Sequence, residues 1–472
     1  MTEDEYLAQD AVGLGELINT HEIAATEALD AALARLARVN PKINAVTLDL
    51  SERARREAKA VSGAGPLAGV PYLLKDLGQT LAGTVTTSSC KLYQDDIADA
   101  DSALTAAYRA AGLVIFGKTN TPEIGLEPVT EPVMFGPTRN PWDLSRTAGG
   151  SSGGAAAAVA AGVVPAAHAS DGGGSIRIPA SCCGLFGLKP SRGRVSFAPK
   201  DEGWGGFSTT HAVTRSVRDS AVLLDIGCRP QPGDPYWAAP PATSFAQAAA
   251  KDPAPLRIAF TTAAFSSDAI EPVCAEAVRA AARLCENLGH HVEEATPPID
   301  RVALSGTGVV VSASIAADFD AIADRRGRPI AEDELEPLTY GAYQRGRAIG
   351  SAAYIRALRA LHAYGRVIGQ FFERYDILIT STLGSPAIPV GALHGEPLDM
   401  EGYADRLFAF MPNTQIFNVT GQPAASLPLA WSRDGLPIGV QFAARHSEDA
   451  LLLSLAGQLE RSASWAGRRP AL

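Results

Sequence analysis

The sequence predicts an α/β fold in which helices cover both faces of a large, twisted, mixed but mostly parallel β-sheet. Three observations support this prediction. Short apolar runs that suit buried strands alternate with longer stretches of helical periodicity along the whole chain. No repeat of about 20–50 residues is visible, which excludes solenoids and propellers. Hydrophobic residues make up 46% and charged residues 19% of the 472 residues, which provides for a substantial core.

The first part of the chain alternates regularly between the two kinds of element. Apolar residues such as Leu17, Ile18 and Leu33 recur at helical spacing, and Gly112 is a helix-stop signal directly before an apolar run. We expect a helix over 16–40, a strand over 44–50, a helix over 51–61, a strand over 70–75, a helix over 102–112 and a buried strand over 113–117.

Glycine, serine and alanine dominate residues 147–193, and the regular alternation resumes after them. We expect a helix over 151–162, an extended segment over 163–170, a loop entering a short helix over 171–181, a strand–helix–strand unit over 256–295, a helix over 351–374, strands over 375–381 and 437–443, and a closing helix over 448–460. The Pro-rich segment 231–244 is the best candidate for an internal boundary. We therefore expect one domain over 1–472, with a core of about 60–230 and 375–445 and a more variable segment over 231–370.

Composition and charge exclude several classes of partner. The net charge of −10 and the pI near 5.4 disfavour nucleic acid and anionic membranes, whose phosphates would repel the chain. The six cysteines form no CxxC pair, which suits free thiols in a reducing cytoplasm. The acidic start lacks the features of a signal peptide, and the most apolar stretch, 153–169, is too short to span a bilayer. We expect a cytoplasmic protein that binds neither nucleic acid nor membrane.

Two motifs match well-known patterns without the physical context that those patterns need. Residues 112–119 fit the phosphate-binding P-loop, but the intervening Leu, Val, Ile and Phe are the strand itself rather than small loop residues. Residues 88–91 read S-x-x-K, but no K-T-G follows. The eight histidines show no metal-ligand spacing, so we expect neither a metal nor any other cofactor.

A third motif is a rival for the catalytic site. Residues 149–153 read G-x-S-x-G, the nucleophile elbow of α/β-hydrolases, which would make Ser151 the nucleophile of an esterase. An elbow needs an apolar strand directly before it, whereas the preceding NPWDLSRTA is turn-like.

Three further elements together indicate acyl-transfer chemistry. Lys75 ends an apolar strand, and burial there would favour a neutral amine that acts as a base. Ser151 and Ser152 follow two glycines at the start of a helix, where a serine is also an ordinary N-cap. Gly172, Gly173 and Gly174 precede Ser175 and leave backbone N–H groups open to bind a developing oxyanion.

These blocks, GVPYLLKD, GGSSGG and DGGGSIRIPAS, resemble the amidase signature family, and matching segments span nearly the whole chain in the family's order. The resemblance implies the amidase signature fold and a Ser–cisSer–Lys site. Ser175 would be the nucleophile, Ser151 would follow a cis peptide bond and bridge to Lys75, and Lys75 would be the base.

The resemblance also assigns supporting roles. The N–H groups of Gly172, Gly173, Gly174 and Ser175 would form the oxyanion hole. Ser152, Asp171 and Arg177 would support the lysine and the glycine loop.

One difference from the usual family sequence indicates which branch of the family this chain resembles. Many members have Thr where this chain has Gly172. The sequence around it is most similar to 6-aminohexanoate-cyclic-dimer hydrolases, aryl acylamidases and carbamate-cleaving relatives. We expect an amidase that acts on small linear or cyclic amides, anilides or carbamates, has side activity on esters and can form a homodimer.

Two alternatives stay open besides the elbow esterase. One is the glutaminase subunit of the glutaminyl-tRNA amidotransferase, which shares the triad. The other is a non-catalytic binding protein with the same fold, which the complete set of Lys75, Ser151 and Ser175 disfavours. The pocket is expected to involve the loop after Thr119 and the 300–350 segment.

Overall fold

The computed structural model describes residues 1–61, 65–200, 202–395 and 400–472. Its helices are α1 (Glu3–Ala8), α2 (Ala11–Asn19), α3 (Ala25–Ile43), α4 (Ser51–Lys59), α5 (Ala103–Ala110), α6 (Gly153–Ala160), α7 (Arg177–Cys183), α8 (Val217–Gly227), α9 (Phe245–Ala249), α10 (Pro272–Asn287), α11 (Arg301–Arg326), α12 (Pro337–Arg347), α13 (Ser351–Arg374), α14 (Met400–Phe410), α15 (Ile416–Thr420) and α16 (Asp449–Ser462).

Eleven strands of the described chain form one mixed sheet in the order β1-β3-β2-β6-β8-β7-β12-β13-β11-β9-β10. They are β1 (Val46–Asp49), β2 (Pro71–Lys75), β3 (Val114–Thr119), β6 (Ala166–Asp171), β7 (Phe186–Lys189), β8 (Thr209–Thr214), β9 (Arg257–Phe260), β10 (His291–Glu294), β11 (Ile377–Ser381), β12 (Ala424–Trp431) and β13 (Pro437–Ala444). The short strands β4 (Arg139–Asn140) and β5 (Asp143–Thr147) form a separate two-stranded sheet, and Arg146 of β5 also forms an isolated antiparallel bridge with Pro389.

The sheet contains two groups of parallel strands that are separated by antiparallel strands at its centre. β2 is parallel to β3 and β6, and β9 is parallel to β10 and β11. Antiparallel pairs through β8, β7, β12 and β13 join these two groups. The predicted α/β class with a large mixed sheet and flanking helices is confirmed.

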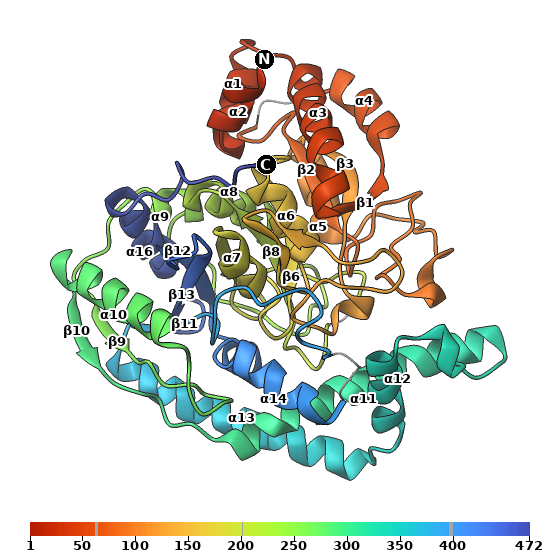
Figure 1. Ribbon diagram of the computed structural model, residues 1–472, viewed down its shortest axis with the longest axis vertical. Helices are drawn as coiled ribbons and strands as arrows, with labels where there is room; N and C mark the ends of the chain where they lie inside the picture. Colours follow the sequence, from red (N-terminus) through yellow and green to blue (C-terminus); the bar gives the residue numbers. More distant parts are fainter. Residues whose placement is uncertain (62–64, 201, 396–399) are drawn as a thin grey trace.

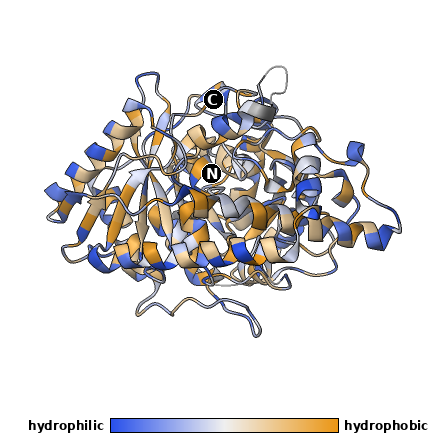
Figure 2. Ribbon diagram, turned by 90° about the horizontal axis from the view of Figure 1, so that it is seen from below, coloured by the Kyte–Doolittle hydropathy of each residue, from blue (hydrophilic) through white to orange (hydrophobic). Residues whose placement is uncertain are grey.

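Helices pack along the width of the sheet and bury its apolar faces. α6 packs on β2, β3 and β6, whereas α7 packs on β7, β12 and β13. α1–α4 lie at one end of the molecule and α11–α14 at the opposite end (Figure 1). Hydrophobic residues concentrate on the strands, and helices at the rim mix hydrophilic with hydrophobic residues (Figure 2). Among the described residues, this distribution leaves one large core between the sheet and its helices and two smaller apolar clusters beside it.

The structure corrects the prediction of one helix over 16–40. The chain breaks after Asn19 and restarts as α3 at Ala25, with His21 in the left-handed region at φ 60°. The Glu27 carboxylate accepts the Ala24 N–H at 2.8 Å, which starts the new helix. The apolar periodicity continued across the break because Ile18 of α2 and Leu29 of α3 enter the same core.

Helix α11 was not predicted, and it is long and apolar enough to cross a membrane by length and composition alone. Half of its apolar stretch is buried inside the structure. Its residues Val310, Ile315 and Phe319 pack into the apolar clusters that it shares with α12 and α13. A core helix passes the same test of length and composition, and the packing of α11 is that of a core helix.

Candidate active site

Two neighbouring parallel strands carry the first site residues to the same edge of the sheet. Lys75 is the last residue of β2, Asp171 is the last residue of β6, and Leu73 lies opposite Ala167. Because parallel strands end at a common edge, the lysine meets the loop that follows β6. That loop is Gly172–Ser175.

The Lys75 ammonium or amine group is buried and contacts two serines. Nζ lies 2.6 Å from Ser151 Oγ and 3.1 Å from Ser170 Oγ, and the residue is 0% exposed. Burial lowers the pKa of Lys75 to about 7, although the negative charge of Asp171 acts in the opposite direction. A substantial fraction of this lysine is therefore a neutral amine near pH 7, as a general base must be.

Ser151 reaches this lysine from the tight turn that precedes α6. The Gly150–Ser151 peptide bond is cis, as the resemblance implies. A Cβ on Gly150 would lie within 2.7 Å of the Val129 backbone, and one on Gly125 would lie 3.2 Å from Ser151 Oγ. Glycine at these positions lets the chain pass close to the serine from two sides.

The glycine loop presents unused backbone donors beside the serines. Within the described chain, none of the N–H groups of Gly172, Gly173, Gly174 and Ser175 donates to a protein acceptor. Thr414 Oγ1 donates to Gly173 O at 2.6 Å and fixes the loop from the opposite side. Three such donors before Ser175, together with its own N–H, suit an anionic oxygen.

Ser175 lies next to the Ser151 segment. The N–H of Ser152 donates to Ser175 O at 3.3 Å, which ties the two segments together. Within the described chain, no hydrogen bond joins the hydroxyls of Ser151 and Ser175. Catalytic hydrogen bonds are often long without substrate and tighten in the reacting complex.

A buried ion pair holds the far end of the loop. Arg177 Nη2 and Nε each lie 2.9 Å from an oxygen of Asp171, and both side chains are 0% exposed. Burial disfavours the charged carboxylate, but the charge and hydrogen bonds of Arg177 outweigh it and lower the pKa of Asp171 to about 2. Asp171 also accepts the Ile176 N–H at 3.1 Å, so the pair fixes the backbone directly after Ser175.

Ser152 makes different contacts from those of a helix cap. Its Oγ donates to Ser170 O at 3.2 Å and accepts the Ser170 N–H at 3.3 Å. It therefore supports Lys75 through Ser170 rather than directly.

Sequence reasoning missed three residues that shape this site. Ser170 contacts Lys75 Nζ, and His168 Nδ1 accepts the Lys75 N–H at 3.2 Å. Burial, with the nearby Lys75, lowers the pKa of His168 to about 3, so this imidazole stays neutral. Asn418 Nδ2 donates to Asp171 Oδ1 at 2.9 Å. The period-two alternation of β6 places His168 and Ser170 on one face, a signal that was available in the sequence.

The structure also decides the competing motifs. Residues 114–119 of the P-loop pattern are β3 itself, and Lys118 Nζ donates to Thr86 Oγ1 at 2.7 Å rather than facing a ligand loop. The strand before Ser151 is β5, which forms a separate two-stranded sheet with β4 and is not part of the eleven-stranded sheet. The elbow interpretation is therefore wrong, because its serine must follow a strand of that sheet. In the S-x-x-K pattern of residues 88–91, Lys91 Nζ donates a hydrogen bond to the backbone oxygen of Asp333 at 3.1 Å.

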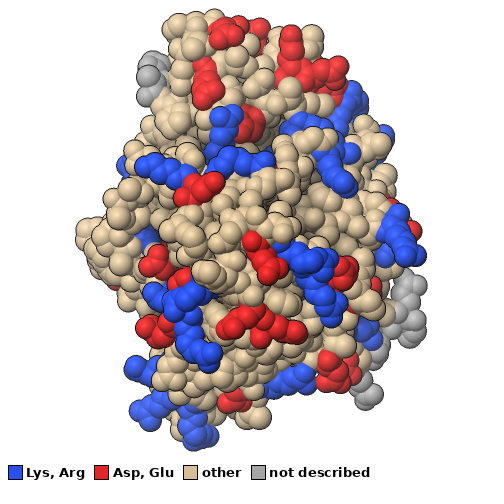
Figure 3. Space-filling view, turned by 90° about the vertical axis from the view of Figure 1, so that its left-hand side faces the viewer, with Lys and Arg blue, Asp and Glu red and all other residues tan. Residues whose placement is uncertain are grey.

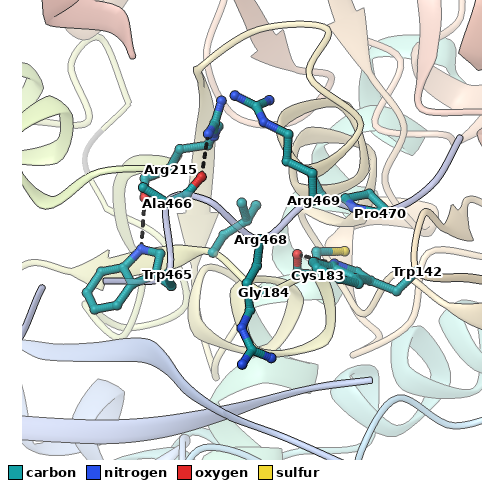
Figure 4. Close-up of a pocket in the computed structure, with 11 residues that line it drawn as sticks. Trp142, Cys183, Gly184, Arg215, Trp465, Ala466, Arg468, Arg469 and Pro470 are labelled. Atoms are coloured by element: carbon teal, nitrogen blue, oxygen red, sulfur yellow. Dashed lines mark hydrogen bonds between the residues drawn. The ribbon is translucent and has the colours of Figure 1, made fainter. Parts of the chain in front are cut away.

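A small cavity lies between the 465–470 segment and the end of α7, lined by Trp142, Arg215 and Trp465 among others (Figure 4). None of its lining residues is a predicted site residue. The residues that the structure describes include no cluster of three or more His, Cys, Asp or Glu that could hold a metal ion.

Comparison with known proteins assigns the chain to a family. The family model described as Amidase matches residues 27–453. The 6-aminohexanoate-cyclic-dimer hydrolase of Paenarthrobacter ureafaciens is 41% identical over 480 residues, covering 99% of this chain and 97% of that protein.

Solved structures agree with this assignment. A structure of 6-aminohexanoate cyclic dimer hydrolase has a TM-score of 0.94 at 41% identity and covers 98% of this chain and 99% of its own. A bacterial aryl acylamidase of the amidase signature family has a TM-score of 0.88 at 26% identity, with 98% of this chain and 99% of its own covered. The chain therefore belongs to the amidase family and is an amidohydrolase, in agreement with the predicted resemblance.

Proposed function

We propose that Ser175, Ser151 and Lys75 form the catalytic triad of this amidase. The observation that carries the proposal is the buried Lys75–Ser151 contact of 2.6 Å beside four backbone N–H groups without a protein acceptor in the described chain. A neutral amine, a relay hydroxyl and an oxyanion site are the parts that acyl transfer needs.

The reaction proceeds in two halves. Neutral Lys75 takes the Ser151 proton while Ser151 takes the proton of Ser175, and Ser175 Oγ bonds to the acyl carbon. The carbonyl oxygen becomes an oxyanion that the N–H groups of residues 172–175 bind. When the C–N bond breaks, the relay runs backwards and gives a proton to the leaving amine. Water then attacks the acyl-enzyme in the same way, releasing the carboxylic acid and restoring Ser175.

The proposed substrates are small amides, anilides and carbamates with apolar or cyclic groups, with side activity on esters. The similarity to proteins named as a cyclic-dimer hydrolase and an aryl acylamidase supports this class. Aryl amines and alkoxides leave more readily than alkyl amines, which favours anilides and esters. Because the triad can attack any acyl carbon that the glycine loop binds, the pocket selects among substrates with similar leaving groups.

We propose further that the enzyme works without metal, nucleotide or nucleic acid, in the cytoplasm, and that it can form a homodimer. The six cysteines are all free, which suits a reducing compartment. One face of the molecule carries interspersed acidic and basic side chains (Figure 3), and the net charge is −10. Neither feature favours phosphate backbones.

Replacing the nucleophile tests the triad. Ser175→Ala should lower kcat by about 10⁴–10⁶-fold with the fold retained. A fluorophosphonate should label Ser175 in the wild type, as read by peptide mass spectrometry. Labelling of Ser151 in place of Ser175 would contradict the assignment of roles.

A substrate panel tests the proposed class. It contains a nitroanilide, a cyclic and a linear oligoamide, an aryl carbamate, an aryl ester and glutamine, each with and without EDTA or ATP. We expect turnover of the apolar amides that neither EDTA nor ATP changes. Turnover of glutamine alone would instead favour the amidotransferase subunit, and loss of activity with EDTA would rule out the metal-free mechanism.

A further inference from the structure

A tight loop beside the oxyanion nest (residues 172–175) holds a tryptophan in an unusual backbone conformation. Trp204, Gly205 and Gly206 all lie in the left-handed region, with φ of 54°, 65° and 80°. The turn is closed by the N–H of Ser208, which donates to Gly203 O at 3.1 Å. Glycine adopts this region without penalty, but for a bulky aromatic residue it is an outlier. Such outliers persist where the surrounding structure enforces them, often at functional sites.

The Trp204 ring lies directly on the first glycine of the nest. A Cβ at Gly172 would be 2.8 Å from both Cε3 and Cζ3 of the indole, closer than real Cβ contacts allow. Any side chain at position 172 would therefore clash with the indole in its observed position. This contact gives a physical reason for glycine where many amidase signature sequences have Thr.

The loop is fixed from three directions. Gly205 lies against α11, where a Cβ would be 2.7 Å from Val310 Cγ1. Gly206 lies against the Tyr236 ring, and Arg192 Nε donates to Gly206 O. The segment predicted to be variable thus supplies two of these three supports, Val310 and Tyr236.

Trp204, whose indole lies on the nest, stays partly exposed to solvent. Trp204 is only half-buried, unlike its neighbours Gly205, Gly206 and Phe207, which are buried. On the same loop, a Cβ on Gly173 would lie 3.8 Å from Met411 Cε. An indole and a thioether methyl group therefore lie against consecutive residues of the nest, and both suit flat or methylene-rich groups.

We propose that Trp204 is a specificity-determining residue, whose indole forms an apolar wall for the substrate group bound beside the oxyanion nest. Gly172 is the small residue that admits this wall. The proposal rests on the proposed function, because it needs residues 172–175 to bind the reacting carbonyl. It predicts a preference for aryl and long-methylene substrates over acetyl-sized ones.

Kinetics on a matched substrate pair test the proposal. Trp204→Ala should lower kcat/KM for an aryl-acyl nitroanilide by about 10–100-fold, the range for loss of an apolar contact. Most of that loss should be in KM, and acetyl nitroanilide should change by less than about 3-fold. Trp204→Phe should keep most of the preference. Trp237→Ala, which removes a tryptophan that is 65% exposed, is the matched control and should change neither substrate.

A double-mutant cycle tests the contact itself. Gly172→Ala should impair the aryl substrate strongly by displacing the indole, and adding Trp204→Ala should recover part of that loss. Additive effects, or an equal fall for both substrates with Trp204→Ala, would overturn the proposal. If circular dichroism shows that Trp204→Ala does not fold, the other two variants test the proposal. Trp204→Phe should then keep most of the preference for the aryl substrate, and Gly172→Ala should lose it.

Fluorophosphonate labelling separates this proposal from the proposed function. The Trp204 variants should be labelled at Ser175 at nearly the wild-type rate, because this small probe does not need the wall. If the wild type itself is not labelled at Ser175, the triad is wrong. If all variants are labelled normally and the preference is unchanged, only the role of Trp204 is wrong.

Discussion

At the scale of single residues, the site contains buried ionisable side chains, and their surroundings decide whether each of them is charged. Lys75 lies against two hydroxyls and is removed from water, and this burial stabilises its amine over its ammonium form. Asp171 is equally buried but is paired with Arg177, so it stays ionised. The same loss of solvent therefore yields a neutral base and a fixed anion on adjacent strands.

The pH dependence of activity should follow Lys75. With its pKa at about 7, kcat/KM should rise as pH increases through neutrality and then level off. Lys75→Ala should be nearly inactive, and Lys75→Arg should not restore activity because arginine stays protonated. Stopped assays from pH 5.5 to 9 would measure this, and a flat profile would exclude the lysine as the base.

The same residue should make stability depend on pH. Its pKa falls from the ordinary 10.5 to about 7 on folding, so between these values the unfolded chain binds a proton that the folded chain does not. The wild type should therefore gain stability relative to Lys75→Met as pH rises from about 7 to about 10.5. Denaturant unfolding of both proteins at several pH values measures the difference, and a constant difference would contradict the lowered pKa.

Arg177 should matter more for stability than any exposed arginine. Arg177→Met leaves Asp171 buried without its partner and should cost about 3–5 kcal/mol of unfolding free energy. Arg283→Met breaks an exposed pair with Glu276 and should cost less than about 1 kcal/mol. Similar losses in the two variants would show that the buried pair does not hold the loop.

At the scale of elements, α6 positions the serines by packing unusually close to the sheet. All eight of its residues, Gly153–Ala160, are buried, and its small side chains let it lie against β2, β3 and β6. Gly154 N donates to Asn120 O at 3.2 Å, just beyond the end of β3. The start of the helix, and with it Ser151, is thus fixed by backbone contact.

A methyl group at Gly154 should therefore be destabilising. A Cβ there would lie 2.4 Å from Asn120 N and 2.6 Å from Ala45 O, and neither backbone atom can move easily. Gly154→Ala should cost about 1–3 kcal/mol and lower activity. Gly308→Ala in α11, which has open space around it, should be neutral or stabilising by up to about 1 kcal/mol. Thermal and denaturant unfolding compare the two.

At the scale of the whole molecule, one sheet connects the predicted core with the variable segment. β9 and β10 come from within 231–370, yet β9 pairs with β11, which pairs with β13. α11 and α13 of the same segment contact the loop that carries Trp204. The variable segment is therefore built into both the sheet and the surroundings of the site.

This continuity predicts cooperative unfolding. Tryptophan fluorescence and far-UV circular dichroism should report the same denaturant midpoint, because losing β9 and β10 exposes the edge of β11. Two separated transitions would show that residues 231–370 unfold as a unit of their own, contrary to the predicted single domain.

The sequence by itself determined the features that depend on local order. The alternation of apolar runs predicted the α/β class, the burial of the strand predicted a perturbed Lys75, and three glycines before Ser175 predicted open N–H donors. The last two properties arise within a few consecutive residues, and the fold class arises from a succession of such local patterns, so spacing and residue type decide the outcome.

Only the tertiary structure decided which distant residues meet. The contacts of Lys75 with Ser170 and His168, of Asp171 with Asn418, and of Trp204 with Gly172 join segments whose approach depends on strand order and loop packing. The break between α2 and α3 was hidden for a similar reason, since both helices bury apolar faces in one core. Local patterns specify which face of an element is apolar, but the packing of the whole chain decides what that face contacts.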